Sequence, residues 1–179
     1  IEGRVGAWLA GEEWKLQAFR DFDDGTGVDL YLKSYASSFN VPVESVPPRG
    51  SEREIGKVCE LMFGFGGGVG AWITGAATYG IDLEQMTEQV WDSLPQWAKI
   101  EAQDFLQWLY EKATAKLAKR LQEPAHFKEH HQTHMLIEAA CLKARFGLTE
   151  RTFIACDAIK RLWRGAHPEI SAYWKELED

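Results

Sequence analysis

The chain of 179 residues is 45% hydrophobic and 26% charged, so it has the size and composition of one folded domain and falls outside the range of disordered proteins. Its three cysteines are far apart and form no C-x-x-C pair, which excludes a small disulfide scaffold and favours reduced thiols. The formal net charge of −7 excludes a global basic footprint, so any contact with nucleic acid has to rest on a local patch.

Helical patterns predominate in the first third of the chain, and long runs of alternating apolar and polar residues are absent. Apolar residues between 5 and 20 recur near helical spacing, with Gly11 as an irregularity, and a second helix is expected over 29–39. The pattern Ser51-x-x-Glu54 predicts a capping box, in which Ser51 accepts a hydrogen bond from a free backbone N–H group. A helix is therefore expected from Ser51 to the glycines that follow Phe63.

The rest of the chain also predicts helices, separated by capping residues, prolines and glycines. We expect an apolar segment over 71–79, a helix capped by Asp82 that ends near Trp91, a long helix from Pro95 toward Leu121, a helix over 127–146 that ends at Gly147, a helix capped by Thr149 that reaches Trp163, and a last helix from Pro168. No internal repeat or linker interrupts this order. The prediction is one all-α unit over residues 1–179.

Four residues spaced by four, Arg53, Lys57, Leu61 and Phe65, form one stripe about 18 Å long on the expected helix. The two cations lie about 6 Å apart along the helix axis, near its N-terminus, where free N–H groups favour an anion. This separation suits a polyphosphate, and the apolar pair offers a surface for a sugar and a base. The alternative is a solvated face of two cations above two core residues.

The segment that carries this stripe, REIGKVCELMFGFG over 53–66, resembles the fingers helix of family A DNA polymerases, the polymerase I family, in its phage and prophage variety. The family pattern is R-x-x-x-K-x-x-x-[F/Y/L]-x-x-x-Y-G. Residues 1–12 resemble the end of the first polymerase motif of the family, 29–31 resemble its D-x-[H/Y] segment, and 155–174 resemble the helix pair after the fingers. The four matches occur in the family's order and leave roughly 80–147 as an expected helical insertion in an all-α fingers subdomain.

The resemblance implies roles for individual side chains. Arg53 and Lys57 would bind the triphosphate of the incoming dNTP, and Lys57 would also be the catalytic general acid for the departing pyrophosphate. Leu61 would face the sugar, and Phe65, where the family usually has Tyr, would stack near the primer–template junction.

Two further nucleotide-binding residues are implied by the other matching segments. Glu2 corresponds to the steric gate of the family, a side chain that occupies the space a ribose 2′-OH would need. Tyr31 stands where many members place a phosphate-contacting His.

For the intact protein, the resemblance implies a DNA-directed DNA polymerase, a nucleotidyltransferase of DNA replication that binds primer–template DNA and dNTP. Mg²⁺ is expected to be bound mainly by residues outside this sequence, because the metal-binding Asp motifs of the family lie upstream of Glu2 and after the last helix. The fragment alone is then expected to be inactive.

The other expectations concern place, assembly and the competing class of protein. We expect a protein of the bacterial host cytoplasm without contact with a membrane, since no apolar run approaches the roughly 20 residues that cross a bilayer. The oligomeric state stays open. The alternative function is a non-enzymatic helical interaction module, or a degenerate prophage remnant that retains the nucleotide-binding stripe.

Two other rows of side chains are first interpreted as solvated helix faces, and each has a functional alternative. His126, His130 and His134 share one helical face, so a zinc-like site is conceivable, although no carboxylate or cysteine clearly completes it. Basic residues of the long helix, interleaved with Glu111 and Glu123, form a stretch that would contact DNA or a partner. These residues are Lys112, Lys116, Lys119 and Arg120.

Overall fold

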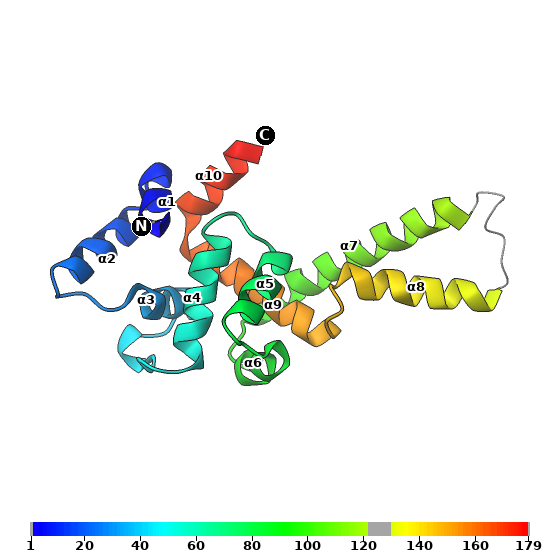
Figure 1. Cartoon of the computed structure of the whole chain (residues 1–179), viewed down its shortest axis with the longest axis horizontal. Coiled ribbons are helices and arrows are strands. Elements are labelled where there is room, and N and C mark those ends of the chain that lie inside the picture. Colours follow the sequence, from blue (N-terminus) through cyan, green and yellow to red (C-terminus); the bar gives the residue numbers. More distant parts are fainter. Residues whose placement is uncertain (1, 122–129, 179) are drawn as a thin grey trace.

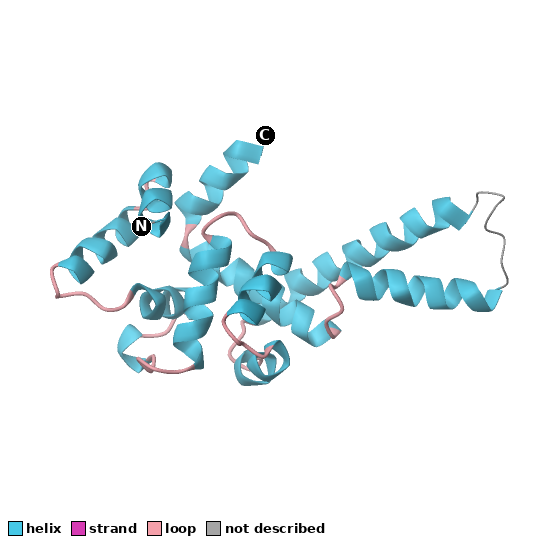
Figure 2. Ribbon diagram, viewed as in Figure 1, coloured by secondary structure: helices cyan, strands magenta, loops and turns pink. Residues whose placement is uncertain are grey.

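The computed structural model describes the backbone of residues 2–121 and 130–178, and the side chains of residues 3–119 and 134–178. Within these ranges every regular element is helical (Figure 2), so the all-α prediction is confirmed. The elements are α1 (Glu2–Ala10), α2 (Glu13–Asp23), α3 (Leu30–Phe39), the short 3₁₀ helix η1 (Val43–Ser45), α4 (Ser51–Phe63), α5 (Val69–Thr78), α6 (Leu83–Val90), α7 (Gln96–Leu121), α8 (His130–Ala144), α9 (Glu150–Ala166) and α10 (Pro168–Glu178). In the described part of the chain no helix has the length and apolar character that a bilayer crossing requires.

The core is organised around α9, which runs through the middle of the helical body (Figure 1) and contacts α3, α4, α5, α6, α7 and α10. Phe153, Ile159 and Trp163 of α9 are fully or almost fully buried. Residues 86–106, from the expected insertion, pack into the same core through Met86, Val90, Leu94 and the first half of α7. This part of the expected insertion is therefore continuous with the body. That it is an insertion relative to the family stays a prediction.

The outer half of α7 and α8 leave this body together as a long helical hairpin (Figure 1). The start of the predicted helix over 127–146 lies partly outside the described residues, and its regular part ends at Ala144 instead of Phe146. The chain turns there because Phe146 and Gly147 both have positive φ, 58° and 79°. Gly11, with φ of 72°, likewise separates α1 from α2, so the pattern over 5–20 forms two helices instead of one.

Two of the three predicted side-chain caps are confirmed. Asp82 Oδ1 accepts hydrogen bonds from the N–H groups of Glu84 and Gln85, and Thr149 Oγ1 accepts one from Thr152. The predicted capping box at Ser51 is wrong, because Gly50 is the N-cap and no side chain caps the helix. Ser51 is the first helical residue, one position too late for its hydroxyl to serve as the cap, and Oγ instead donates to Glu52 Oε2 at 3.2 Å.

Gly56 allows α4 to lie directly against α3. A Cβ atom at Gly56 would collide with the Tyr31 carbonyl oxygen and lie 3.3 Å from Tyr35 Cβ. We expect Gly56→Ala to lower the free energy of unfolding by about 1–3 kcal/mol, since one helix must shift. Gly165→Ala, inside α9 where a Cβ meets nothing within 4 Å, is the matched control and is expected to be neutral or to stabilise by up to about 1 kcal/mol. Urea unfolding of both variants checks this, and equal effects would contradict the close-packing explanation.

Candidate functional site

A groove of about 560 Å³ lies between α1, α2, α3 and α4. Its walls combine aromatic and aliphatic side chains with two arginines and two carboxylates. The lining residues are Gly3, Arg4, Phe19, Phe22, Asp29, Leu30, Tyr31, Arg53, Glu60, Leu61 and Phe65. We call it the α1–α4 groove; four of the six predicted nucleotide-binding residues line it, namely Tyr31, Arg53, Leu61 and Phe65.

Arg53 lies in the first turn of α4 and is held by two carboxylates. Its Nε and Nη2 atoms donate to Asp29 Oδ2 at 2.9 and 2.7 Å, and Nη1 donates to Glu54 Oε1 at 3.1 Å. These contacts, led by the hydrogen bonds to Asp29, raise the pKa of Arg53, so the guanidinium stays charged. Because the Arg53–Asp29 pair is about 28% exposed, it is worth only about 1 kcal/mol or less, and an anionic ligand can compete for the guanidinium.

Asp29 has a second role that fixes its neighbour Tyr31. It is the N-cap of α3, where Oδ1 accepts the Tyr31 N–H at 2.7 Å. The guanidinium carbon of Arg53 lies 5.2 Å from the centre of the Tyr31 ring. Burial, followed by the Asp29 charge, raises the pKa of Tyr31, so the phenol keeps its proton and can donate a hydrogen bond to a ligand in the groove.

Lys57 lies one turn beyond Arg53 on α4, but it is not among the residues that line the α1–α4 groove. Its ammonium lies 4.1 Å from the centre of the Tyr79 ring and 3.8 Å from Glu54 Oε2. The side chain is about a quarter exposed and its four-carbon stem is flexible. Its assigned role therefore requires the ammonium to leave Tyr79, and that role stays a prediction.

The apolar end of the stripe extends past the regular part of α4. That helix ends at Phe63, and Phe65 lies in the following turn, where the Gly66 N–H bonds to Phe63 O and the Gly67 N–H bonds to Met62 O. This pair of bonds, with Gly66 at φ of 76°, is a Schellman motif. Phe65 was expected on the helix itself; the motif keeps it in the terminal turn, 46% exposed and facing the groove.

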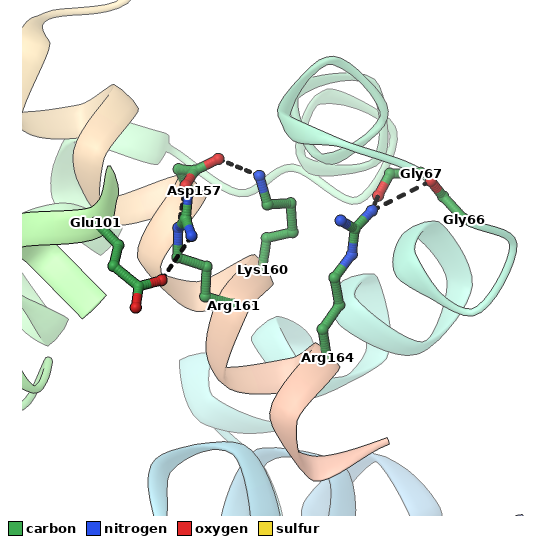
Figure 3. A network of polar contacts seen from close by, with 7 residues as sticks. All are labelled: Gly66, Gly67, Glu101, Asp157, Lys160, Arg161 and Arg164. Atoms are coloured by element: carbon green, nitrogen blue, oxygen red, sulfur yellow. Dashed lines mark hydrogen bonds and ion pairs between the residues drawn. The ribbon is translucent and has the colours of Figure 1, made fainter. Parts of the chain in front are cut away.

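The turn that carries Phe65 is held by side chains of the last two helices. Trp174 of α10 donates from Nε1 to Gly64 O at 2.8 Å and lies 6.4 Å from Phe65 between ring centroids. Arg164 of α9 reaches the carbonyl oxygens of Gly66 and Gly67 at 3.4 and 3.3 Å (Figure 3). These two helices therefore position the glycine turn at the end of the stripe.

The same face of α9 carries a charge network centred on the buried Asp157 (Figure 3). The Asp157 carboxylate has no exposed surface and contacts Lys160 through Oδ1 and Arg161 through Oδ2. Arg161 also lies 2.7 Å from Glu101 of α7. This network joins α9 to the base of the hairpin, so its role is in packing.

Glu2 begins α1, but its side chain lies outside the described ones. Its neighbour Arg4 lines the groove, donates to both oxygens of Asp23 at 2.5 and 2.6 Å, and lies over Phe19. Sequence reasoning missed Arg4 and Phe19 as site residues. They belong to α1 and α2, and only the packing of these helices on α3 and α4 brings them into the groove.

Glu60 borders the groove and is the centre of a buried network. The carboxylate pairs with Lys15 of α2, accepts a hydrogen bond from Trp163 Nε1 at 3.1 Å, and lies 3.1 Å from His167 Nε2. Burial would raise the pKa of Glu60, but Lys15 and His167 together lower it to about 2. The carboxylate therefore stays ionised and joins α2, α4 and α9 beneath the groove.

The carboxylates of the groove do not fit a Mg²⁺ site. Asp29 is engaged by Arg53 and by the N-terminus of α3, and Glu60 is engaged by Lys15 and Trp163. Across the described residues no three Asp, Glu, His or Cys side chains are grouped as metal ligands. A divalent cation would need further carboxylate or carbonyl oxygens.

The histidine row gives no support for a zinc site in the part of the chain that is described. His126 and the side chain of His130 lie outside it, and His134 is exposed with Nδ1 at 3.7 Å from Glu138 Oε1. A single imidazole beside a single carboxylate does not meet the ligand count of a zinc site.

The groove thus combines aromatic walls with cations near a helix N-terminus, which is the chemistry of a nucleotide- or nucleic-acid-binding site.

Over 91 residues, 50% of the chain, the sequence is 45% identical to a protein of Bacillus phage SP02 named DNA polymerase. The match covers 13% of the length of that relative. No protein-family profile matches the chain, and no solved structure does. The predicted relationship to a phage DNA polymerase is confirmed, whereas family A and the fingers region stay predictions.

Proposed function

We propose that this chain is the fingers region of a phage-type family A DNA polymerase, and that the α1–α4 groove with α4 binds the incoming dNTP next to the primer–template. The observation that carries the proposal is the meeting of Tyr31, Arg53, Leu61 and Phe65 in one groove. They come from two segments that the family resemblance had linked. The identity to the protein of phage SP02 named DNA polymerase supports the DNA polymerase part of this proposal.

In this proposal, the triphosphate replaces Asp29 and Glu54 as the partner of Arg53. Arginine grips phosphate oxygens in bidentate fashion, and the first turn of α4 adds free N–H groups. Lys57 leaves Tyr79 to reach the β- and γ-phosphates, and as general acid it protonates the departing pyrophosphate. The Tyr31 hydroxyl donates to a phosphate oxygen.

The other residues complete the site. Leu61 faces the sugar, Phe65 stacks at the primer–template junction, and Glu2 acts as the steric gate that disfavours a ribose. The metal ions that activate the primer hydroxyl would be bound mainly by residues outside this sequence, since the carboxylates of the groove are engaged elsewhere. We accordingly expect no primer extension by these 179 residues alone, and we place the intact enzyme in the cytoplasm of a bacterial host.

Direct titration with a fluorescent dNTP in the presence of Mg²⁺ tests the proposal on the chain itself. We expect weak binding by the wild type and an affinity roughly tenfold to a hundredfold lower in the Arg53→Ala/Lys57→Ala variant, since each charge-assisted phosphate contact contributes about 1.5–3 kcal/mol and Arg53 must first leave Asp29.

The control is Lys33→Ala/Lys175→Ala, which removes the same charge from α3 and α10, away from the lining of the groove. Its affinity for dNTP is expected to stay within about twofold of the wild type, because salt largely screens surface charges that do not contact the ligand. Equal affinities of the two double variants, or no binding by the wild type, would favour the non-enzymatic helical module instead.

A further inference from the structure

The outer half of α7 carries a row of one tryptophan and three lysines. This half of the helix belongs to the projecting hairpin, away from the helices α1–α4 that form the groove (Figure 1). The row consists of Trp108, Lys112, Lys116 and Lys119, all exposed. At 100° per residue these side chains fall within an arc of about 80°, and the three lysines span about 10 Å along the helix. We call them the outer α7 row.

The row faces away from α8. The side chains that are partly covered in the same stretch, Ala113, Thr114 and Leu117, lie on the other side of α7, where the second arm of the hairpin packs. The outer face is therefore open along its length, and an extended polymer can approach it without moving either helix.

The charge on this face is concentrated and unbalanced. Residues 112–119 include no Asp or Glu, and within the described side chains none of the three lysines is paired with a carboxylate. The nearest acid along the helix, Glu111, lies about 80–140° around the axis from the lysines and accepts a hydrogen bond from Gln107. In a chain of net charge −7, such a local row of cations is complementary to a polyanion.

An indole stands at the inner end of the row. Trp108 is 46% exposed, stacks on Phe105 at 5.6 Å between ring centroids, and has the Lys112 ammonium 4.0 Å from its ring centre. Packing on Phe105 holds the ring in place, whereas the flexible Lys112 can move from its face to a phosphate. A positioned aromatic ring followed by lysines is the arrangement that stacks an unpaired base and follows a single strand.

We propose that the outer α7 row binds single-stranded DNA, with Trp108 stacking one base and the three lysines contacting successive phosphates. The hairpin would thereby hold an unpaired template strand apart from the α1–α4 groove. The proposal extends the proposed function, but its residues and its test are separate from those of the nucleotide site.

Fluorescence anisotropy of the full chain with a labelled oligo(dT) of about 12 nucleotides tests this, a length within the usual site sizes for single strands. The Lys112→Gln/Lys116→Gln/Lys119→Gln variant is expected to bind at least about tenfold more weakly, and the slope of log K against log salt should fall in magnitude by roughly 2, because each phosphate contact contributes about 0.7. Trp108→Leu, which keeps an apolar side chain, should cost about fivefold or more.

The matched control is Lys33→Gln/Lys143→Gln/Lys175→Gln, which removes the same charge from α3, the inner end of α8 and α10, and should stay within about twofold of the wild type at moderate salt. The proposal is overturned if both triple variants weaken binding equally, if wild-type chain shows no binding at low salt, or if a duplex of the same length binds more tightly than the single strand. The row variant should keep the dNTP affinity of the wild type, so the failure of this proposal is distinguishable from failure of the nucleotide site.

Discussion

Glu60→Gln is expected to lower the free energy of unfolding by about 3–5 kcal/mol, because removal of one partner leaves a buried charge without compensation. The Lys15 side chain is only 1% exposed and pairs with Glu60, which is 4% exposed. Glutamine keeps the volume and can still accept from Trp163 Nε1, but it cannot neutralise the Lys15 ammonium. Urea unfolding followed by far-ultraviolet circular dichroism measures the effect.

The control for this variant is Glu13→Gln, which breaks the exposed pair with Arg20 on the same helix as Lys15. It should cost about 1 kcal/mol or less, since exposed ion pairs contribute little. Comparable losses in the two variants would show that the Glu60 network adds nothing beyond an ordinary surface pair.

The pH dependence of stability gives a second measurement on Glu60. Its pKa is lowered from 4.5 to about 2 by Lys15 and His167, which outweigh the effect of burial. A carboxylate with a lowered pKa contributes stability above its ordinary pKa, and that contribution is lost as the pH falls through the folded value. The free energy of unfolding of the wild type should therefore decrease more steeply than that of Glu60→Gln between pH 4.5 and about 2; parallel curves would contradict the assignment.

Lys57→Ala is expected to reduce kcat for primer extension by about 10²–10⁴-fold in the full-length protein that carries this sequence, the range for loss of a general acid. Lys57→Arg should restore much of the dNTP affinity, because the charge is kept. It should not restore kcat, because a guanidinium does not release its proton. Arg53→Ala should act mainly on the KM for dNTP, because it removes binding that ground state and transition state share.

Steady-state kinetics on a primed template separates these effects. Lys33→Ala is the control, because it removes one positive charge from α3 just as Lys57→Ala removes one from α4. Undiminished extension by Lys57→Ala would remove its catalytic role.

The helices and their caps were largely predictable from the sequence because they depend on neighbours. Asp82 and Thr149 cap their helices through N–H groups two or three residues away, so short patterns are sufficient. The exception was Ser51: α4 begins at Ser51 itself, one residue earlier than a serine cap requires, because the extended Gly50 takes the cap position. Nothing in the Ser51-x-x-Glu54 pattern distinguishes a serine at the cap from one at the first helical position.

The stripe on α4 was also predictable, since it follows from the helical period, but its surroundings were not. The partner of Arg53 is Asp29, 24 residues away, and Phe65 keeps its place through a glycine turn held by Trp174. The direction of the Lys57 side chain, toward Tyr79, is likewise set by the packing of the end of α5 beside α4.

The order of the residues was sufficient to predict that this protein is helical and carries two cations followed by two apolar residues on one helix, and its motifs indicated the relationship to a phage DNA polymerase. The packing of the helices was needed to show that this stripe borders a groove completed by α1 and α2, and that Glu60 is a buried partner of Lys15 and Trp163 instead of a groove ligand. This difference follows from the range of the interactions. Helical period and capping act over a few residues, whereas Glu60 and Trp163 are 103 residues apart. These two residues meet only because the packing of the buried helix faces sets the angles at which the helices cross.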